Sequence, residues 1–316
     1  MTAPAPSTVL RYSTGTGRWV MAAMVLGSSL AFIDATVVNI ALPAIGRDLH
    51  VGAAGLQWTI NGYSLSLASL VLLGGSLGDR YGRKRVFTIG VAWFAAASLC
   101  CALAPNVALL IGARVLQGVG GALLTPGALA ILEASFAPED RSRAIGAWSG
   151  LAGIGGALGP FLGGWLVDVA DWRFIFLINV PVAVVVLWLT ARHVPESSDR
   201  AATRDPDVTG VVTGAAALGG LTYGFTAWPT HGPGSPSVLI ALGIGVAGTA
   251  AFVLAERRVP HPMLPLQIFS SPVFTGANLV TFVVYAANGG VFFLVVMNLQ
   301  VVAGTARWAA AWLCCR

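Results

Sequence analysis

Charged residues are scarce in this sequence. Asp, Glu, Lys and Arg make up 10% of its 316 residues, whereas a soluble domain carries roughly a quarter. Hydrophobic residues reach 56%, so the polar side chains are too few to cover a water-soluble globule. This composition excludes a soluble protein and predicts an integral membrane protein whose main partner is the lipid bilayer.

Patterns typical of metal sites and active sites are missing too. The four cysteines and four histidines do not have the spacing of a metal site, and we find no nucleophilic triad or paired carboxylates. The glycines of "GVGG" and "GIGG" lie inside apolar runs and not after a strand, which excludes a nucleotide-binding fold. The net charge of +5 is spread over loops, so no nucleic-acid partner is expected. We predict neither an enzyme nor a cofactor.

Long apolar runs, in contrast, are abundant. A helix of about 20 apolar residues crosses the hydrocarbon core, where only helices and closed barrels satisfy the backbone. The runs are continuous and do not alternate in ten-residue segments, which favours helices over a barrel. We therefore predict an all-α multi-span membrane protein. Its nine expected spans lie near residues 19–43, 56–78, 86–104, 108–133, 144–167, 174–192, 208–228, 237–255 and 273–301.

Lysine and arginine are distributed unevenly among the loops. Thirteen lie in the N-terminal tail, in the loops after spans 2, 4, 6 and 8, and at the end of span 6, and two lie in the loops after the odd-numbered spans. Basic residues concentrate on the cytoplasmic side of membrane proteins. The bias therefore predicts a multi-pass protein of the cell membrane with its N-terminus in the cytoplasm.

One cytoplasmic loop has features that orientation alone does not explain. In "GGSLGDRYGRKRVF", residues 74–87, the basic residues fit an orientation signal, but an acid and regularly placed glycines are not needed for it. A carboxylate that ends one helix and faces basic residues at the start of the next would form a breakable contact. The two interpretations are a cytoplasmic gate and a simple orientation signal. The candidate gate residues are Gly75, Gly78, Asp79, Arg80, Gly82, Arg83 and Lys84.

Two charged residues fall well inside expected spans. Asp34 lies near the middle of the first span, where a charge costs about 2.5–3.5 kcal/mol, so it should face a cavity or a partner. Arg114 lies in the fourth span and shares one helix face with Gln117 and Gly118. The alternatives are a structural Asp34 bonded to a neighbouring helix and an Arg114 that reaches the outer surface along its aliphatic stem.

The fifth span is rich in glycine. Gly155, Gly159 and Gly163 recur every fourth residue, so they line one helix face on which a neighbouring helix can approach closely. Pro160 removes a backbone hydrogen bond and should bend the helix. Generic close packing is the alternative to a specific motif. The complete pattern comprises Gly146, Gly155, Gly159, Pro160, Gly163 and Gly164.

Together these stretches resemble the major facilitator superfamily, and within it the fourteen-span drug:proton antiporters. The resemblance rests on "SLAFIDATVVNIALP", "GSLGDRYGRKRVF", "LIGARVLQGVGGALLTPG" and the glycine–proline pattern of span 5. It implies alternating access driven by the proton gradient, with protons and small amphipathic molecules or drugs as substrates. It also implies that Asp34 and Arg114 take part in proton coupling, or that Asp34 contacts a cationic substrate.

The expected organisation begins with a disordered tail, residues 1–18, and a six-helix half, residues 19–192. A linker (193–207), a two-helix insertion (208–255), a cytoplasmic loop (256–272) and one further helix (273–301) follow. The tail 302–316 does not resemble the family, whose members continue with five more spans. We therefore expect a truncated or frame-shifted product. Two functions stay open, a proton-coupled exporter and a non-transporting membrane fragment, while the span-5 pattern disfavours an importer.

Overall fold

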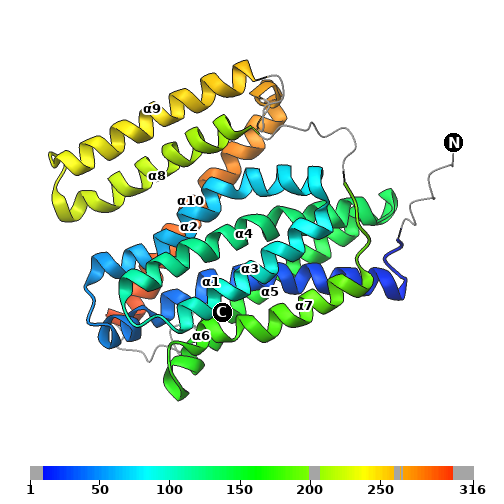
Figure 1. Ribbon diagram of the computed structural model, residues 1–316, viewed down its shortest axis with the longest axis horizontal. Coiled ribbons are helices and arrows are strands. Elements are labelled where there is room, and N and C mark those ends of the chain that lie inside the picture. The colour runs from blue at the N-terminus through cyan, green and yellow to red at the C-terminus, as the bar shows by residue number, and fades with distance from the viewer. Residues whose placement is uncertain (1–9, 199–206, 260–263, 265, 302–316) are drawn as a thin grey trace.

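A computed structural model describes residues 10–198, 207–259, 264 and 266–301, and these form a set of long helices (Figure 1). The predicted C-terminal tail 302–316 and most of the predicted linker, residues 199–206, lie outside the described residues. In chain order the elements are α1 (Gly15–Asp48), α2 (Ala53–Tyr81), α3 (Arg83–Ala102), α4 (Val107–Ser135), α5 (Pro138–Val169), α6 (Phe174–Leu177), α7 (Asn179–His193), α8 (Val208–His231), α9 (Pro236–Arg258), the 3₁₀ turn η1 (Leu266–Ser270) and α10 (Pro272–Val301).

The predicted all-α membrane fold is confirmed. Seven helical segments of the described chain are long and apolar enough to cross a membrane: α1 to α5, the α6–α7 stretch, and α9. As membrane spans, α8 and α10 stay predictions. The expected sixth span is interrupted at Ile178, close to Pro181, which has no N–H to donate to the Leu177 carbonyl.

The first helix begins earlier than the sequence predicted. Thr14 caps α1 by accepting a hydrogen bond from the Gly17 N–H at 3.1 Å, which is the preferred chemistry for a helix start. Before it, the Leu10 N–H donates to the Ser135 carbonyl at 2.8 Å, and the Leu10 carbonyl accepts from Ala137 at 3.0 Å. The expected disordered tail, residues 1–18, is therefore wrong for residues 10–18, and residues 1–9 lie outside the described part.

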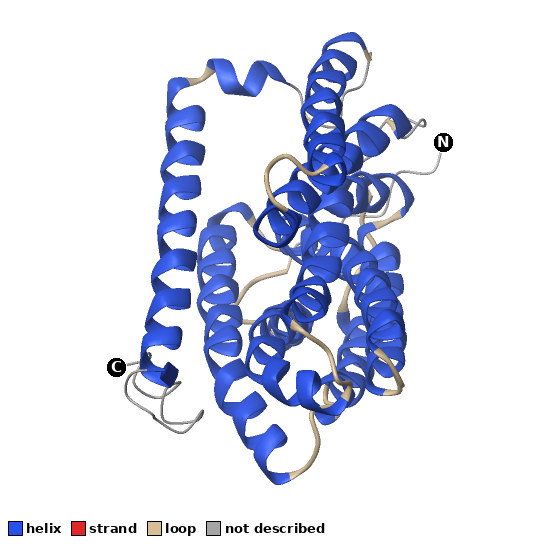
Figure 2. Ribbon diagram, turned by 90° about the vertical axis from the view of Figure 1, so that its left-hand side faces the viewer, coloured by secondary structure: helices blue, strands red, loops and turns tan. Residues whose placement is uncertain are grey.

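Helices α1 to α7 form one bundle, in which α1 packs on α5 and α4 packs on both α2 and α3. The α8–α9 hairpin lies along α2 at the edge of this bundle (Figure 1). Its two helices meet through small residues: a Cβ on Gly245 or Gly248 would lie 2.7 Å from a backbone nitrogen of α8. Helix α10 stands apart from the bundle (Figure 2).

The bundle interior contains two apolar clusters at different heights. One surrounds Phe87 and Phe94, and includes Leu30 of α1 and Leu124 of α4. The other surrounds Phe176 and includes residues further along α1 and earlier in α4. Between them lies a set of buried polar side chains, called here the polar layer: Asp34, Ser98, Arg114, Gln117 and Asn179.

Candidate functional site

The polar layer is built around an ion pair between α1 and α4. Arg114 Nη1 donates to Asp34 Oδ2 at 2.5 Å, and the two side chains are 1% and 0% exposed. Burying two charges carries a desolvation cost that their attraction offsets only when further hydrogen bonds satisfy both groups. The rest of the polar layer supplies those hydrogen bonds.

Neutral side chains complete the coordination of the Asp34 carboxylate. Its second oxygen, Oδ1, accepts from Gln117 Nε2 at 2.8 Å and from Asn179 Nδ2 at 3.3 Å. The same two amides donate to Ser98 Oγ at 2.8 and 3.3 Å. Gln117 also accepts from Arg114 at 2.7 Å through its Oε1. Helices α1, α4 and α7 therefore meet at one aspartate, and Ser98 of α3 is joined to it through the two amides.

Arg114 is fixed from two further directions. Its Nε donates to the Thr59 carbonyl of α2 at 3.1 Å. Its guanidinium carbon lies 4.3 Å from the ring centre of Tyr63 and 5.8 Å from that of Phe176, which are cation–π contacts. The side chain points into the bundle and does not reach the outer surface.

Glycine allows α4 to approach α2 closely beside this site. The predicted shared face of Arg114, Gln117 and Gly118 divides in the structure: Gln117 faces Asp34, and Gly118 faces α2. A Cβ on Gly118 would collide with Ser66 Oγ and with the Tyr63 carbonyl. Gly118 therefore sets the distance between the helices that hold Arg114 and its aromatic neighbour.

The loop between α2 and α3 brings together two of the predicted gate residues. Arg83 donates to Asp79 Oδ1 from Nε at 2.8 Å and from Nη2 at 2.7 Å. Its Nη1 reaches the Ala130 carbonyl of α4 at 3.2 Å. Arg80 instead lies over the Tyr81 ring at 4.5 Å, and Lys84 Nζ donates to a backbone carbonyl of α7 at 3.2 Å.

The glycines of this loop differ in how strongly the structure requires them. Gly82 has a φ of +107°, in a region that side chains rarely adopt. A Cβ there would also lie 2.7 Å from Glu196 Oε1. Gly75 and Gly78 are less constrained, since a Cβ on either would meet nothing closer than 3.7 Å.

Glu196, in the segment after α7, caps α3 and was not predicted from the sequence. Its Oε1 accepts from the Lys84 N–H at 3.0 Å and its Oε2 from the Arg85 N–H at 3.2 Å. The next carbonyl, of Ser197, accepts from the Arg83 N–H at 2.8 Å. A carboxylate is favoured at a helix N-terminus, and here it connects the linker to the loop between α2 and α3.

The predicted glycine face of α5 packs against α1. A Cβ on Gly155 would lie 2.7 Å from Ser29 Oγ, and one on Gly163 would lie 2.5 Å from Val37 Cγ2. A Cβ on Gly159 would collide with Thr36 Oγ1. Gly164 is buried as well, whereas a Cβ on Gly146 would meet open space.

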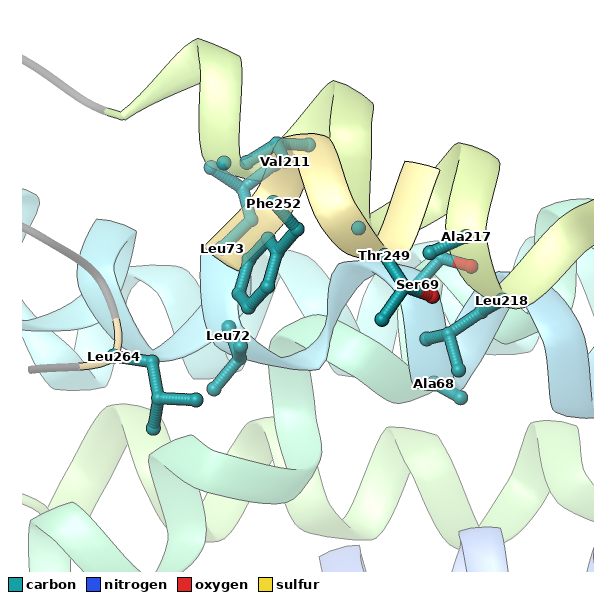
Figure 3. A pocket seen from close by; sticks show the side chains of 12 residues that line it. Ala68, Ser69, Leu72, Leu73, Val211, Ala217, Leu218, Thr249, Phe252 and Leu264 are labelled. Carbon is teal, nitrogen blue, oxygen red and sulfur yellow. The ribbon is translucent and has the colours of Figure 1, made fainter. Parts of the chain in front are cut away.

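A separate cavity lies between α2 and the α8–α9 hairpin. It measures about 250 Å³ and is lined by apolar side chains such as Leu72 and Phe252, with hydroxyls only from Ser69 and Thr249 (Figure 3). No residue of the polar layer borders it. Within the described residues, no three His, Cys, Asp or Glu side chains cluster as metal ligands would.

The fold and the buried ion pair define a class: a multi-span membrane protein with a charged site enclosed by its helices. The family model of the major facilitator superfamily matches residues 24–314. The chain belongs to the major facilitator superfamily, and the predicted resemblance is confirmed.

Curated relatives within this family are resistance proteins. The chain is 36% identical over 302 residues to a methylenomycin A resistance protein of Bacillus subtilis (strain 168), covering 94% of this chain and 64% of the relative. It is 39% identical over 273 residues to a tetracenomycin C resistance and export protein of Streptomyces glaucescens, covering 86% and 51%. This chain therefore spans about half to two thirds of the length of these relatives.

Solved structures agree on the fold. The chain is similar to the peptide transporter POT in complex with sulfate, with a TM-score of 0.58 and 15% identity over 80% of this chain and 55% of that one. It is also similar to a bacterial homologue of the human lysosomal transporter Spinster, with a TM-score of 0.51 and 22% identity over 80% and 64%. At these identities the similarity shows the fold alone.

Proposed function

We propose that this chain serves in the export of small amphipathic molecules in exchange for protons, with Asp34 as the residue that takes up and releases the proton. The observation that supports this most directly is the Asp34–Arg114 pair, which is enclosed between two apolar clusters. Intramembrane ionisable residues of this kind mark ion and proton paths. The printed names of the relatives, which are resistance and export proteins, support an exported antibiotic or drug.

Protonation of Asp34 would change the contacts between α1 and α4. A proton on Oδ2 replaces the hydrogen bond from Arg114 Nη1 and removes the negative charge that attracts the guanidinium. Arg114 would keep Gln117 Oε1 and the Thr59 carbonyl as acceptors. Proton binding therefore weakens the contact between α1 and α4, while Arg114 keeps two hydrogen-bond acceptors. A proton-driven conformational step requires such a contact, which changes with protonation and leaves no buried charge without a partner.

The proton gradient supplies the energy for this cycle. With the N-terminus in the cytoplasm, as the loop charges predict, a proton moving inward gains about 2.3 kcal/mol per 100 mV of membrane potential. Alternating access couples that movement to the substrate by exposing one site to each side in turn. In this proposal Arg114 is the partner that Asp34 contacts again once the proton has left on the cytoplasmic side.

The gate loop and the glycine face of α5 have supporting roles in the proposal. Asp79 and Arg83 would hold the cytoplasmic ends of α2 and α3 against α4 in one conformation and separate in another. The Gly155, Gly159 and Gly163 face would keep α5 and α1 in close contact while the bundle moves.

Expression in a bacterial host that lacks its own efflux pumps tests the proposal. The chain should lower the accumulation of an amphipathic dye, and a protonophore should abolish that effect. If a host with the chain correctly inserted in its membrane accumulates as much dye as a host without the chain, the alternative, a non-transporting membrane fragment, is favoured. Export that persists after the proton gradient has collapsed would contradict proton coupling.

A further inference from the structure

Thr36 of α1 contacts α5 through its hydroxyl group. Its Oγ1 lies 3.1 Å from the Gly156 carbonyl oxygen of α5. It also lies 3.1 and 3.0 Å from the carbonyls of Phe32 and Ile33 in its own helix. A hydroxyl has one proton to donate, so it can serve one of these three acceptors at a time.

The Gly156 carbonyl needs an external donor because of Pro160. In an α-helix the N–H of residue 160 would donate to the carbonyl of residue 156. Proline has no N–H, and its ring also pushes against that carbonyl. Helix α5 nevertheless continues through Pro160, from Pro138 to Val169. The Thr36 hydroxyl, 3.1 Å from the Gly156 carbonyl oxygen, can therefore donate to it in place of the missing N–H.

Gly159 allows Thr36 to reach this carbonyl. A Cβ on Gly159 would collide with Thr36 Oγ1 and would lie 3.3 Å from the Ile33 carbonyl. A larger residue at position 159 would therefore separate α5 from α1 at the level of the proline. Gly159 and Pro160 act on one contact, since the glycine opens the space and the proline frees the acceptor.

The opposite face of α1 carries the proposed proton site. Two residues correspond to roughly 200° around a helix axis, so Asp34 faces α4 while Thr36 faces α5. We infer that Thr36 is a positioning residue that holds the part of α5 around Pro160 on α1, next to Asp34. By exchanging its hydrogen bond between Gly156 and its own helix, it lets α5 shift without leaving the hydroxyl unpaired.

Hydrogen exchange of the purified chain tests this inference without any transport assay. Thr36→Val keeps the shape of the side chain and removes the hydroxyl. Amide exchange in residues 153–165 should then rise about three- to tenfold, the size expected for one neutral hydrogen bond. Thr36→Ser keeps the hydroxyl and should stay within about twofold of the unchanged chain.

A matched control comes from α3. The Thr88 hydroxyl donates to the Lys84 carbonyl of its own helix at 2.8 Å. Thr88→Val should therefore leave exchange in residues 153–165 unchanged. An equal rise in this control and in Thr36→Val would overturn the inference.

The decisive arm restores the missing donor. Pro160→Ala supplies an N–H for the Gly156 carbonyl, so Thr36→Val should have little effect in that background. Pro160→Ala should also restore folding if the Thr36→Val chain alone does not fold. A Thr36→Val effect of the same size with and without Pro160→Ala would overturn the inference, and so would no effect in either background.

The consequence for transport rests on the proposed function. In a chain that exports, Thr36→Val should slow export several-fold while Thr36→Ser retains it, and equal export by both variants would overturn this role of Thr36. A complete lack of export by the unchanged chain would count against the proposed function. The hydrogen-exchange experiment would still test whether Thr36 holds α5 through the Gly156 carbonyl.

Discussion

Two aspartate–arginine pairs in this molecule share their chemistry and differ in their surroundings. Asp34 and Arg114 are 0% and 1% exposed and meet at 2.5 Å. Asp79 and Arg83 are 42% and 21% exposed and meet at 2.7 Å. The first pair joins two helices inside the bundle, and the second joins two helix ends at its surface.

The difference in burial determines how strongly each pair holds. Removing one partner of a buried pair costs about 3–5 kcal/mol, because the other charge stays in a low-dielectric interior. Exposed pairs contribute about 0–1 kcal/mol, because water screens them. The buried pair is therefore suited to a step that only a change of protonation triggers, and the exposed pair to a contact that opens readily.

The largest effect is expected from breaking the buried pair. Arg114→Leu leaves the Asp34 carboxylate without its countercharge, so the free energy of unfolding should fall by about 3–5 kcal/mol. Denaturant unfolding of the purified chain in detergent measures this loss. The double variant Asp34→Leu/Arg114→Leu removes both charges and should be more stable than Arg114→Leu alone. A double variant that is less stable would contradict the account of the pair.

A steric contact on the other face of α1 should have an intermediate effect. Gly159→Leu places a branched side chain against Thr36, and overpacking of this kind costs about 1–3 kcal/mol. The same unfolding measurement tests it. Gly153→Leu is the control, because a Cβ on Gly153 meets open space. Equal losses in the two variants would show that the α1–α5 contact is not the cause.

The exposed pair should matter little for stability. Asp79→Asn removes the carboxylate charge and should change the free energy of unfolding by less than about 1 kcal/mol. In a chain that exports, however, it should reduce transport while membrane insertion stays normal. Transport at the unchanged rate would favour the simple orientation signal over the gate.

The smallest expected effect is that of salt, which also distinguishes the two pairs most selectively. Ions screen exposed charges and reach buried pairs much less. The difference in the free energy of unfolding between Asp79→Asn and the unchanged chain is small already, and raising the salt concentration should reduce it further. Raising the salt concentration should leave the difference for Arg114→Leu nearly the same. A loss of the Arg114→Leu effect in salt would mean that water reaches the buried pair.

Much of the fold could be predicted from the sequence because the bilayer restricts it. Continuous apolar runs have few alternatives to helices, and Asp34 and Arg114 are conspicuous as charges within such runs. The resemblance implies a shared part in proton coupling, but the hydrogen bonds between the two could not be predicted, since 80 residues separate them and helix packing alone brings them together. Ser98 and Asn179 are ordinary polar residues in apolar runs, and only their position opposite Asp34 makes them part of the site.

Glu196 and Thr36 show a different limit of sequence reasoning. Glu196 caps a helix that lies 112 residues earlier, and an acid in a polar linker has no local pattern that points to its partner. A threonine in a membrane helix usually bonds to its own preceding turn, as Thr36 also can. Its contact with α5 depends on the crossing of the two helices.

The central claim, that Asp34 carries the proton, is tested most directly by gradient-dependent export in membrane vesicles. The unchanged chain should export an amphipathic dye only when a proton gradient is imposed. Asp34→Asn cannot ionise, so it should reach the membrane but lose this export, while Asp34→Glu should retain part of it. Export by Asp34→Asn with the normal dependence on the gradient would contradict the account and place the proton carrier elsewhere.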